Sequence, residues 1–124
     1  MRLPVTRPVV LDADLASGWL KRVLPSNRER VDQIERELGG RGEAEVIGVA
    51  LELESSIVLI DERAARRYAL ARGLQVRGTL GVVLHAKRRG LIEHATPLLD
   101  YLRRSGFWLD DATYRKAREL ASEP

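Results

Sequence analysis

From residue 28 onward, segments with apolar residues at helical spacing alternate with short apolar segments. Over residues 28–38, Val31, Ile34 and Leu38 recur three or four positions apart, and two glycines follow them. This spacing predicts a helix that ends at Leu38. The same reasoning predicts five more helices, over about 43–54, 62–72, 79–89, 96–105 and 111–121.

Short apolar segments between these helices predict strands over residues 57–61, 74–78 and 107–109. Strands that are apolar throughout are typical of a parallel sheet that is covered on both faces. Two candidate strands precede the first helix, over residues 8–11 and 18–24. The alternation predicts an α/β fold with a mainly parallel sheet and right-handed crossovers. We expect one domain over residues 1–124.

Three carboxylates fall close together in this arrangement. The helix 43–54 begins with Glu43 and Glu45, and the strand 57–61 ends in Asp61. A helix of about 10 residues spans ~15 Å and a strand of five spans ~16 Å, so antiparallel packing places the start of one beside the end of the other. Clustered carboxylates without histidine or cysteine favour Mg²⁺ or Mn²⁺. The alternatives are that Asp61 caps the next helix and that both glutamates complement a helix dipole.

The bulk composition narrows the class of protein. The chain has no cysteine, a formal net charge of +3 and 44% hydrophobic residues, which is typical of a soluble globular domain without disulfides. No apolar run approaches the length that spans a membrane, and the first residues lack the apolar stretch of a signal peptide. We therefore expect a cytoplasmic protein that does not interact with membranes.

Charge is unevenly distributed along the chain. Residues 29–54 carry eight acids against three arginines, whereas residues 61–90 carry eight bases against two acids. This pattern suits an enzyme that binds a metal ion next to a polyanion, and it also suits two solvated helix faces. We expect Trp19 and Trp108 to fill the core rather than stack on bases.

Several motifs together resemble the carboxyl half of a PIN-domain protein. They are Gly42-Glu43-Ala44-Glu45, Ala50–Leu53, Leu59–Arg66 and Gly78–Leu84, with further agreement at Ala86-Lys87, Gly90–Ile92, Pro97–Asp100 and Gly106-Phe107. The resemblance covers roughly residues 18–120. It is strongest to a PIN branch grouped with VapC-like toxins.

The resemblance implies a three-layer α/β sandwich and a metal-dependent nuclease. Glu45 and Asp61 match acids that hold Mg²⁺ or Mn²⁺ in the family, and Glu43 is a supporting candidate. Arg63 and Arg66 match basic positions beside the site and are expected to bind RNA. The implied function is an endoribonuclease, the toxin of a toxin–antitoxin pair, with a cognate antitoxin protein as a partner.

The chain departs from the family pattern at its amino end. A PIN domain opens with a strand that ends in an essential aspartate, and two helices follow. Asp12, after the segment 9–11, is one candidate for that metal ligand. Alternatively, residues 1–17 are an irregular remnant, and the first strand–helix–helix unit is missing. The missing strand would leave an open sheet edge, which favours a homodimer. In that case a second reading is a non-catalytic truncated PIN-like domain that acts as a binding module.

Overall fold

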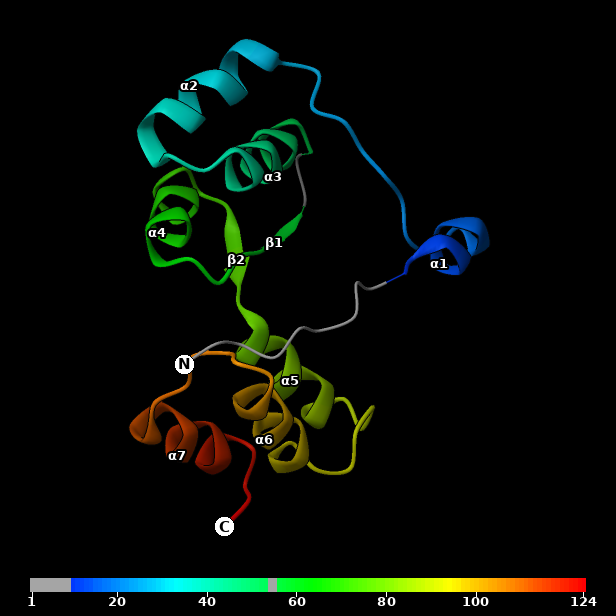
Figure 1. Cartoon of the computed structure of the whole chain (residues 1–124), viewed down its shortest axis with the longest axis vertical. Coiled ribbons are helices and arrows are strands. Elements are labelled where there is room, and N and C mark those ends of the chain that lie inside the picture. Colours follow the sequence, from blue (N-terminus) through cyan, green and yellow to red (C-terminus); the bar gives the residue numbers. More distant parts are fainter. Residues whose placement is uncertain (1–9, 54–55) are drawn as a thin grey trace. The chain divides into compact units, whose positions relative to one another are not determined.

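The computed structural model describes residues 10–53 and 56–124, which form two compact units (Figure 1). We call Val10–Gly78 the α/β unit and Thr79–Pro124 the helical unit. No helix in the described part of the chain is both long and apolar enough to cross a membrane. The elements of the α/β unit are α1 (Asp12–Ser17), α2 (Arg28–Leu38), α3 (Arg41–Glu52), β1 (Ile57–Leu59), α4 (Arg63–Ala71) and β2 (Gln75–Arg77), and those of the helical unit are α5 (Thr79–Arg88), α6 (Thr96–Arg104) and α7 (Asp111–Leu120).

The sheet of the α/β unit consists of two parallel strands among the described residues. Val58 lies opposite Val76, and the Ile60 amide donates a hydrogen bond to the Arg77 carbonyl at 3.0 Å. α4 connects the end of β1 to the start of β2, as parallel strands require. The predicted α/β class with a parallel sheet is therefore confirmed.

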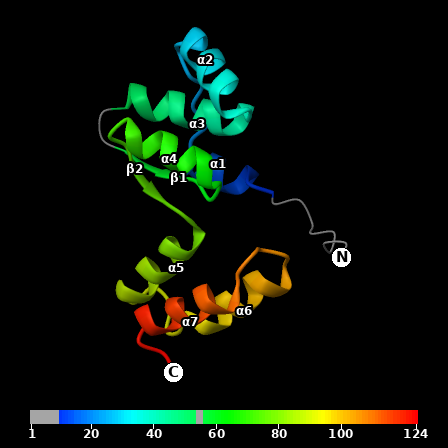
Figure 2. The same ribbon diagram turned by 90° about the vertical axis from the view of Figure 1, so that its left-hand side faces the viewer.

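One apolar cluster fills the α/β unit. α3 and β1 lie side by side and run in opposite directions (Figure 2). Val58 and Ile60 are buried, whereas Ile57 and Leu59 are 48% and 62% exposed, because successive side chains of a strand point to opposite faces. Only one face of β1 therefore packs on this core, whose buried members are Val31, Ile34, Ala44, Ile47, Ala50, Val58, Ile60, Ala65 and Ala69.

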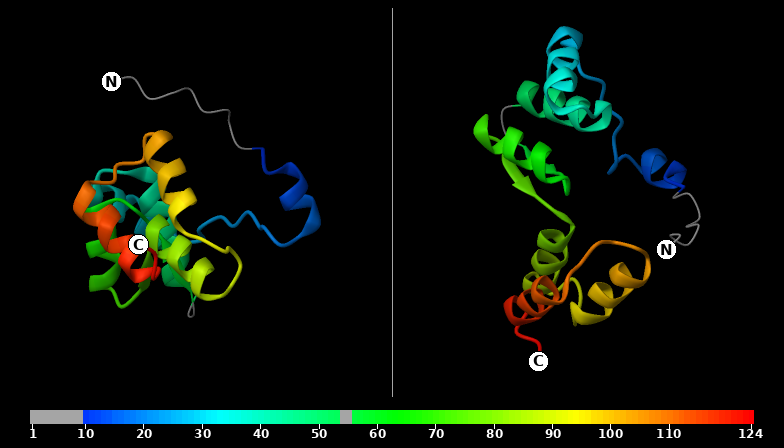
Figure 3. Two further views of the ribbon diagram at one scale, coloured as in Figure 1. Left: turned by 90° about the horizontal axis from the view of Figure 1, so that it is seen from below. Right: turned by 60° about the vertical axis from the view of Figure 1, so that its left-hand side comes forward.

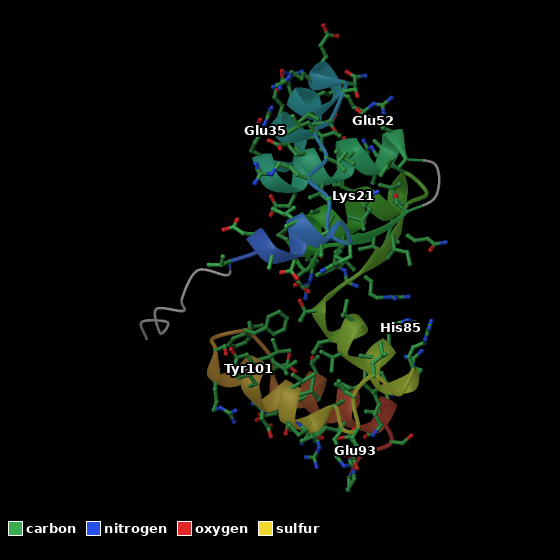
Figure 4. The ribbon with its side chains drawn as sticks, turned by 90° about the vertical axis from the view of Figure 1, so that its right-hand side faces the viewer. Lys21, Glu35, Glu52, His85, Glu93 and Tyr101 are labelled. Atoms are coloured by element: carbon green, nitrogen blue, oxygen red, sulfur yellow. The ribbon has the colours of Figure 1, made fainter. Side chains whose placement is uncertain are left out.

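α2 and α3 form a tightly joined antiparallel pair. A β-carbon at Gly48 of α3 would lie 2.7 Å from Val31 Cγ2 of α2, so the close approach requires glycine. At the other end, Glu52 Oε1 accepts hydrogen bonds from the amides of Ser26 (2.8 Å) and Asn27 (2.9 Å) (Figure 4). These bonds, led by the one from Asn27, lower the pKa of Glu52.

The helical unit packs α5, α6 and α7 around a second cluster (Figure 3). Leu99 is fully buried at its centre, and Ala95, Ala117 and Ala121 let the three helices approach closely. Glu123 links α5 to the start of α6. Its carboxylate accepts hydrogen bonds from Lys87 Nζ (2.9 Å), from the amides of Ala95 (2.7 Å) and Thr96 (2.9 Å), and from Thr96 Oγ1 (2.7 Å). This carboxylate therefore supplies the first turn of α6 with acceptors.

Acid is expected to loosen the helical unit through Glu123. Bonds from Thr96, Ala95 and Lys87 hold the Glu123 pKa well below its usual range of about 4.3. A depressed folded-state pKa adds stability above about pH 4.3, and that stability is lost as the pH falls toward the folded pKa. The melting temperature should therefore drop more steeply below pH 4.3 in wild type than in Glu123→Gln. Glu119→Gln removes an exposed carboxylate of α7 and should leave the wild-type slope unchanged. Equal slopes for wild type and Glu123→Gln would contradict this role.

Several sequence predictions near the chain ends are wrong. Residues 18–24 and 107–109 form no strand, and neither do Val10 and Leu11, which end the segment 8–11 (Pro8 and Val9 lie outside the described residues). Trp19 and Trp108 are 71% and 86% exposed instead of filling the core. An apolar segment becomes a strand only beside a pairing partner, and the described residues offer these segments none.

Candidate functional site

The candidate site lies at the carboxyl ends of the two parallel strands, where α/β proteins commonly bind ligands. Asp61 follows β1 and Gly78 follows β2. A β-carbon at Gly78 would lie 2.9 Å from Asp61 Oδ1 and 3.2 Å from Arg66 Nη1. An acid from the loop and a guanidinium from α4 therefore both lie close to the end of β2, and both residues are exposed to solvent.

The residue that caps α4 is Glu62, not Asp61. Its carboxylate accepts bonds from the amides of Ala64 (3.0 Å) and Ala65 (2.7 Å), and these bonds lower its pKa. The alternative that Asp61 caps this helix is therefore wrong, because the helix begins at Arg63 and Glu62 occupies the N-cap position. Arg63 is the first residue of α4 and is exposed beside the cap.

Glu45 lies in a separate ionic cluster. Its Oε1 accepts from Arg41 Nε at 3.1 Å, and Arg41 Nη1 also contacts Asp32 (2.6 Å) and Glu35 (2.8 Å) of α2. These bonds, the one to Asp32 above all, raise the pKa of Arg41. The carboxylate of Glu45 is thus engaged by its own helix, one turn back.

Glu43 lies over the amino end of α3. Its carboxylate lies in the space that a side chain at Gly40 would occupy, and the Gly40 backbone itself is extended, with φ −119°. The position of Glu43 in the first turn complements the helix dipole. This location agrees with the alternative prediction, in which Glu43 complements the helix dipole. Asp12 begins α1, where it is exposed.

The three carboxylates do not form a metal-binding group. Within residues 10–53 and 56–124, no three acidic, histidine or cysteine side chains come together in a way that could hold an ion. The length estimate placed Glu43, Glu45 and Asp61 together, but Glu45 binds Arg41 of its own helix and the Glu43 carboxylate lies over Gly40. The assignment of Glu45 and Asp61 as ligands stays a prediction.

A smaller donor set still suits a hard cation. Mg²⁺ is commonly bound through one or two carboxylates, and phosphates and water complete its shell. An exposed aspartate next to an arginine meets that requirement when a phosphate is present, because the arginine attracts the phosphate. The described residues therefore fit a cation that is bound together with substrate, and they do not fit a closed protein cage.

An apolar groove of about 490 Å³ runs between α3 and β1. Glu45 and Lys21 (Figure 4) add charge to its lining. The Ser56 hydroxyl, which also lines it, is buried and has no hydrogen-bond partner within residues 10–53 and 56–124. Sequence reasoning missed this groove and also missed Gly78. A glycine directly after a strand was the available signal, since it often marks a close approach. The apolar residues of the lining are Val23, Pro25, Val46, Val49, Ala50, Leu53, Ile57, Val58 and Leu59.

Comparison with known proteins identifies a family. A protein-family model for a PIN domain (DUF3368) matches residues 6–123. No curated protein and no solved structure matches the chain. The family match extends over nearly the whole sequence, includes every residue of the candidate site, and agrees with the parallel α/β arrangement. The chain belongs to the PIN-domain family, which has a nuclease-type fold.

Proposed function

We propose that this protein is a metal-dependent endoribonuclease whose site lies at Asp61 and Arg66. The observation that carries the proposal is that both side chains border Gly78 at the end of β2 in a chain of the PIN family. An exposed carboxylate at the carboxyl edge of a parallel sheet is accessible to both a cation and an RNA strand.

Each residue of the proposed site has a separate task. Arg66 and Arg63 bind RNA phosphates through charge-assisted hydrogen bonds, and Asp61 holds Mg²⁺ or Mn²⁺. The cation, when bound, activates water and stabilises the charge that develops on the phosphate. Glu45 and Glu43 are additional catalytic and metal-binding candidates, and each would have to leave its present contact to contribute. Asp12 is a further candidate metal ligand.

Removal of metal tests this proposal. The purified chain is expected to cleave RNA in millimolar Mn²⁺ or Mg²⁺ and to lose that activity completely in excess chelator, because the cation supplies the activated water. Activity should return when Mn²⁺ is added back. The readout is the appearance of fragments from an end-labelled RNA. Undiminished cleavage in chelator would exclude the metal-dependent mechanism.

The same proposal includes a toxin role in the cytoplasm, with a cognate antitoxin protein that blocks the nuclease. Induced expression of the wild-type chain is then expected to stop growth, because cellular RNA is cleaved. Expression of Asp61→Asn to the same level should not stop growth. Growth arrest by both forms would mean that any toxicity does not depend on Asp61.

We also propose that the chain forms a homodimer through β1. The outer edge of this strand has no pairing strand in the described part of the chain, and Leu59 and Ile57 are exposed next to the groove. An unpaired strand edge beside apolar side chains favours association. Light scattering during gel filtration should give twice the monomer mass for wild type and the monomer mass for Leu59→Lys. A wild-type monomer would contradict this part of the proposal.

A second candidate function is a non-catalytic PIN-like module that binds RNA. The observation that favours it is the lack of any three-acid group among residues 10–53 and 56–124. This candidate predicts RNA binding without cleavage in millimolar Mn²⁺ by a chain with a native circular dichroism spectrum. Metal-dependent cleavage by the same preparation would exclude it.

A further inference from the structure

Gly78 is not one of the glycines that a positive φ explains. Gly18, Gly39 and Gly73 have positive φ, and the backbone at Gly78 does not, so its conformation is open to any residue. Gly78 is buried at the end of β2. The reason for glycine at this position is therefore space and not backbone conformation.

The atoms that surround Gly78 are polar. A β-carbon there would lie 2.9 Å from Asp61 Oδ1, 3.2 Å from Arg66 Nη1 and 3.6 Å from the Ile60 carbonyl oxygen. By contrast, a β-carbon at Gly48 would meet the Val31 side chain of the apolar core. Gly48 therefore serves helix packing, whereas Gly78 borders the charged groups of the proposed site.

We propose that Gly78 is a positioning residue, whose missing side chain lets the Asp61 carboxylate and the Arg66 guanidinium lie together over the end of β2. A methyl group at position 78 would need the space that the carboxylate occupies, since a carbon–oxygen distance of 2.9 Å is shorter than van der Waals contact. Asp61 would turn away from β2, and Arg66 would be displaced with it. The expected effect on metal binding rests on the proposed function. The contact between position 78 and Asp61 rests on geometry alone.

The first test measures Mn²⁺ binding to the full chain by electron paramagnetic resonance, with and without a short RNA that carries a non-cleavable backbone. Gly78→Ala is expected to weaken Mn²⁺ binding in the presence of RNA by about 10-fold or more, the range seen when a supporting residue of a metal site is lost. Gly48→Ala is the matched control, because it introduces an equally crowded methyl group far from the charged pair. It should lower the melting temperature and leave Mn²⁺ affinity, measured well below melting, unchanged.

The second test needs no bound metal. Gly78→Ala is expected to lower the melting temperature in the wild-type background and to lower it less in an Asp61→Ala background, because the shortened side chain removes the nearest clash. Residues in contact show such non-additivity, and distant residues do not. Gly48→Ala should lower the melting temperature equally in both backgrounds.

The two tests separate the inference from the proposed function. If wild type binds no Mn²⁺ with RNA, the proposed function fails, and the coupling between positions 78 and 61 still decides whether Gly78 positions Asp61. If wild type binds Mn²⁺ and Gly78→Ala binds it equally well, the positioning role is overturned while the proposed function stands. Additive effects of Gly78→Ala and Asp61→Ala on melting would also overturn it.

Discussion

Asp61→Asn is expected to reduce RNA cleavage by more than about 100-fold, because loss of a direct ligand exceeds the 10–100-fold effect of losing an outer partner of a metal site. Asparagine keeps the size of the side chain and its place beside Gly78 and Arg66, so the fold should be preserved. The measurement is the initial rate of cleavage of an end-labelled RNA at saturating Mn²⁺.

RNA binding should distinguish a catalytic defect from a binding defect. Removal of a negative charge next to Arg66 strengthens the attraction of the site for a polyanion, so in metal-free buffer Asp61→Asn is expected to bind RNA at least as tightly as wild type. Arg66→Ala is expected to show the opposite pattern, with weaker binding that depends less on salt. Glu29→Gln, which removes an exposed acid from α2, serves as the matched control and should cleave at the wild-type rate. Wild-type cleavage by Asp61→Asn would remove Asp61 from the proposed mechanism.

Ile47→Ala is expected to have the largest effect on stability. Ile47 is fully buried on α3 within the core of the α/β unit. Truncation of a buried isoleucine to alanine costs about 2–5 kcal/mol through lost burial and the cavity that remains. A loss of that size is a large part of the 5–15 kcal/mol that is typical of a whole domain. The measurement is the midpoint of urea unfolding, followed by circular dichroism.

The neighbouring residue provides the control for Ile47. Val46 lies on the same helix and is 44% exposed. Val46→Ala should therefore change the free energy of unfolding by less than about 1 kcal/mol, because a large part of this side chain already contacts water. Equal losses for the two variants would contradict the assignment of the Ile47 side of α3 to the core.

Secondary structure was predicted best where the apolar spacing and a terminating glycine indicated the same boundary. The helix 28–38 has Val31 and Ile34 at helical spacing and Gly39 at its end, and both bounds are confirmed. Gly39 takes the positive φ that ends a helix. The strand 57–61 is also present, shortened to Ile57–Leu59, because only these residues lie in register opposite residues of β2.

Tertiary contacts could not be predicted from the sequence pattern. Trp108 was expected in the core because tryptophan is strongly apolar, yet its neighbour Leu109 takes the buried position and Trp108 faces water. An extended segment alternates sides, and composition does not say which side is covered. The prediction of a carboxylate cluster was wrong for a related reason. A length estimate places the ends of a helix and a strand, but it does not include partners that compete for the carboxylates, such as Arg41. The family resemblance was confirmed because it rested on several motifs at once.

The bonds from Ser26 and Asn27 to Glu52 have a consequence for hydrogen exchange. Amides that precede a helix usually exchange with solvent quickly, because nothing in the helix accepts from them. Here the acceptor is a carboxylate at the far end of α3, so both amides stay protected only while α2 and α3 remain paired. Their exchange rates therefore report the opening of this helical hairpin as a local event, separate from unfolding of the core.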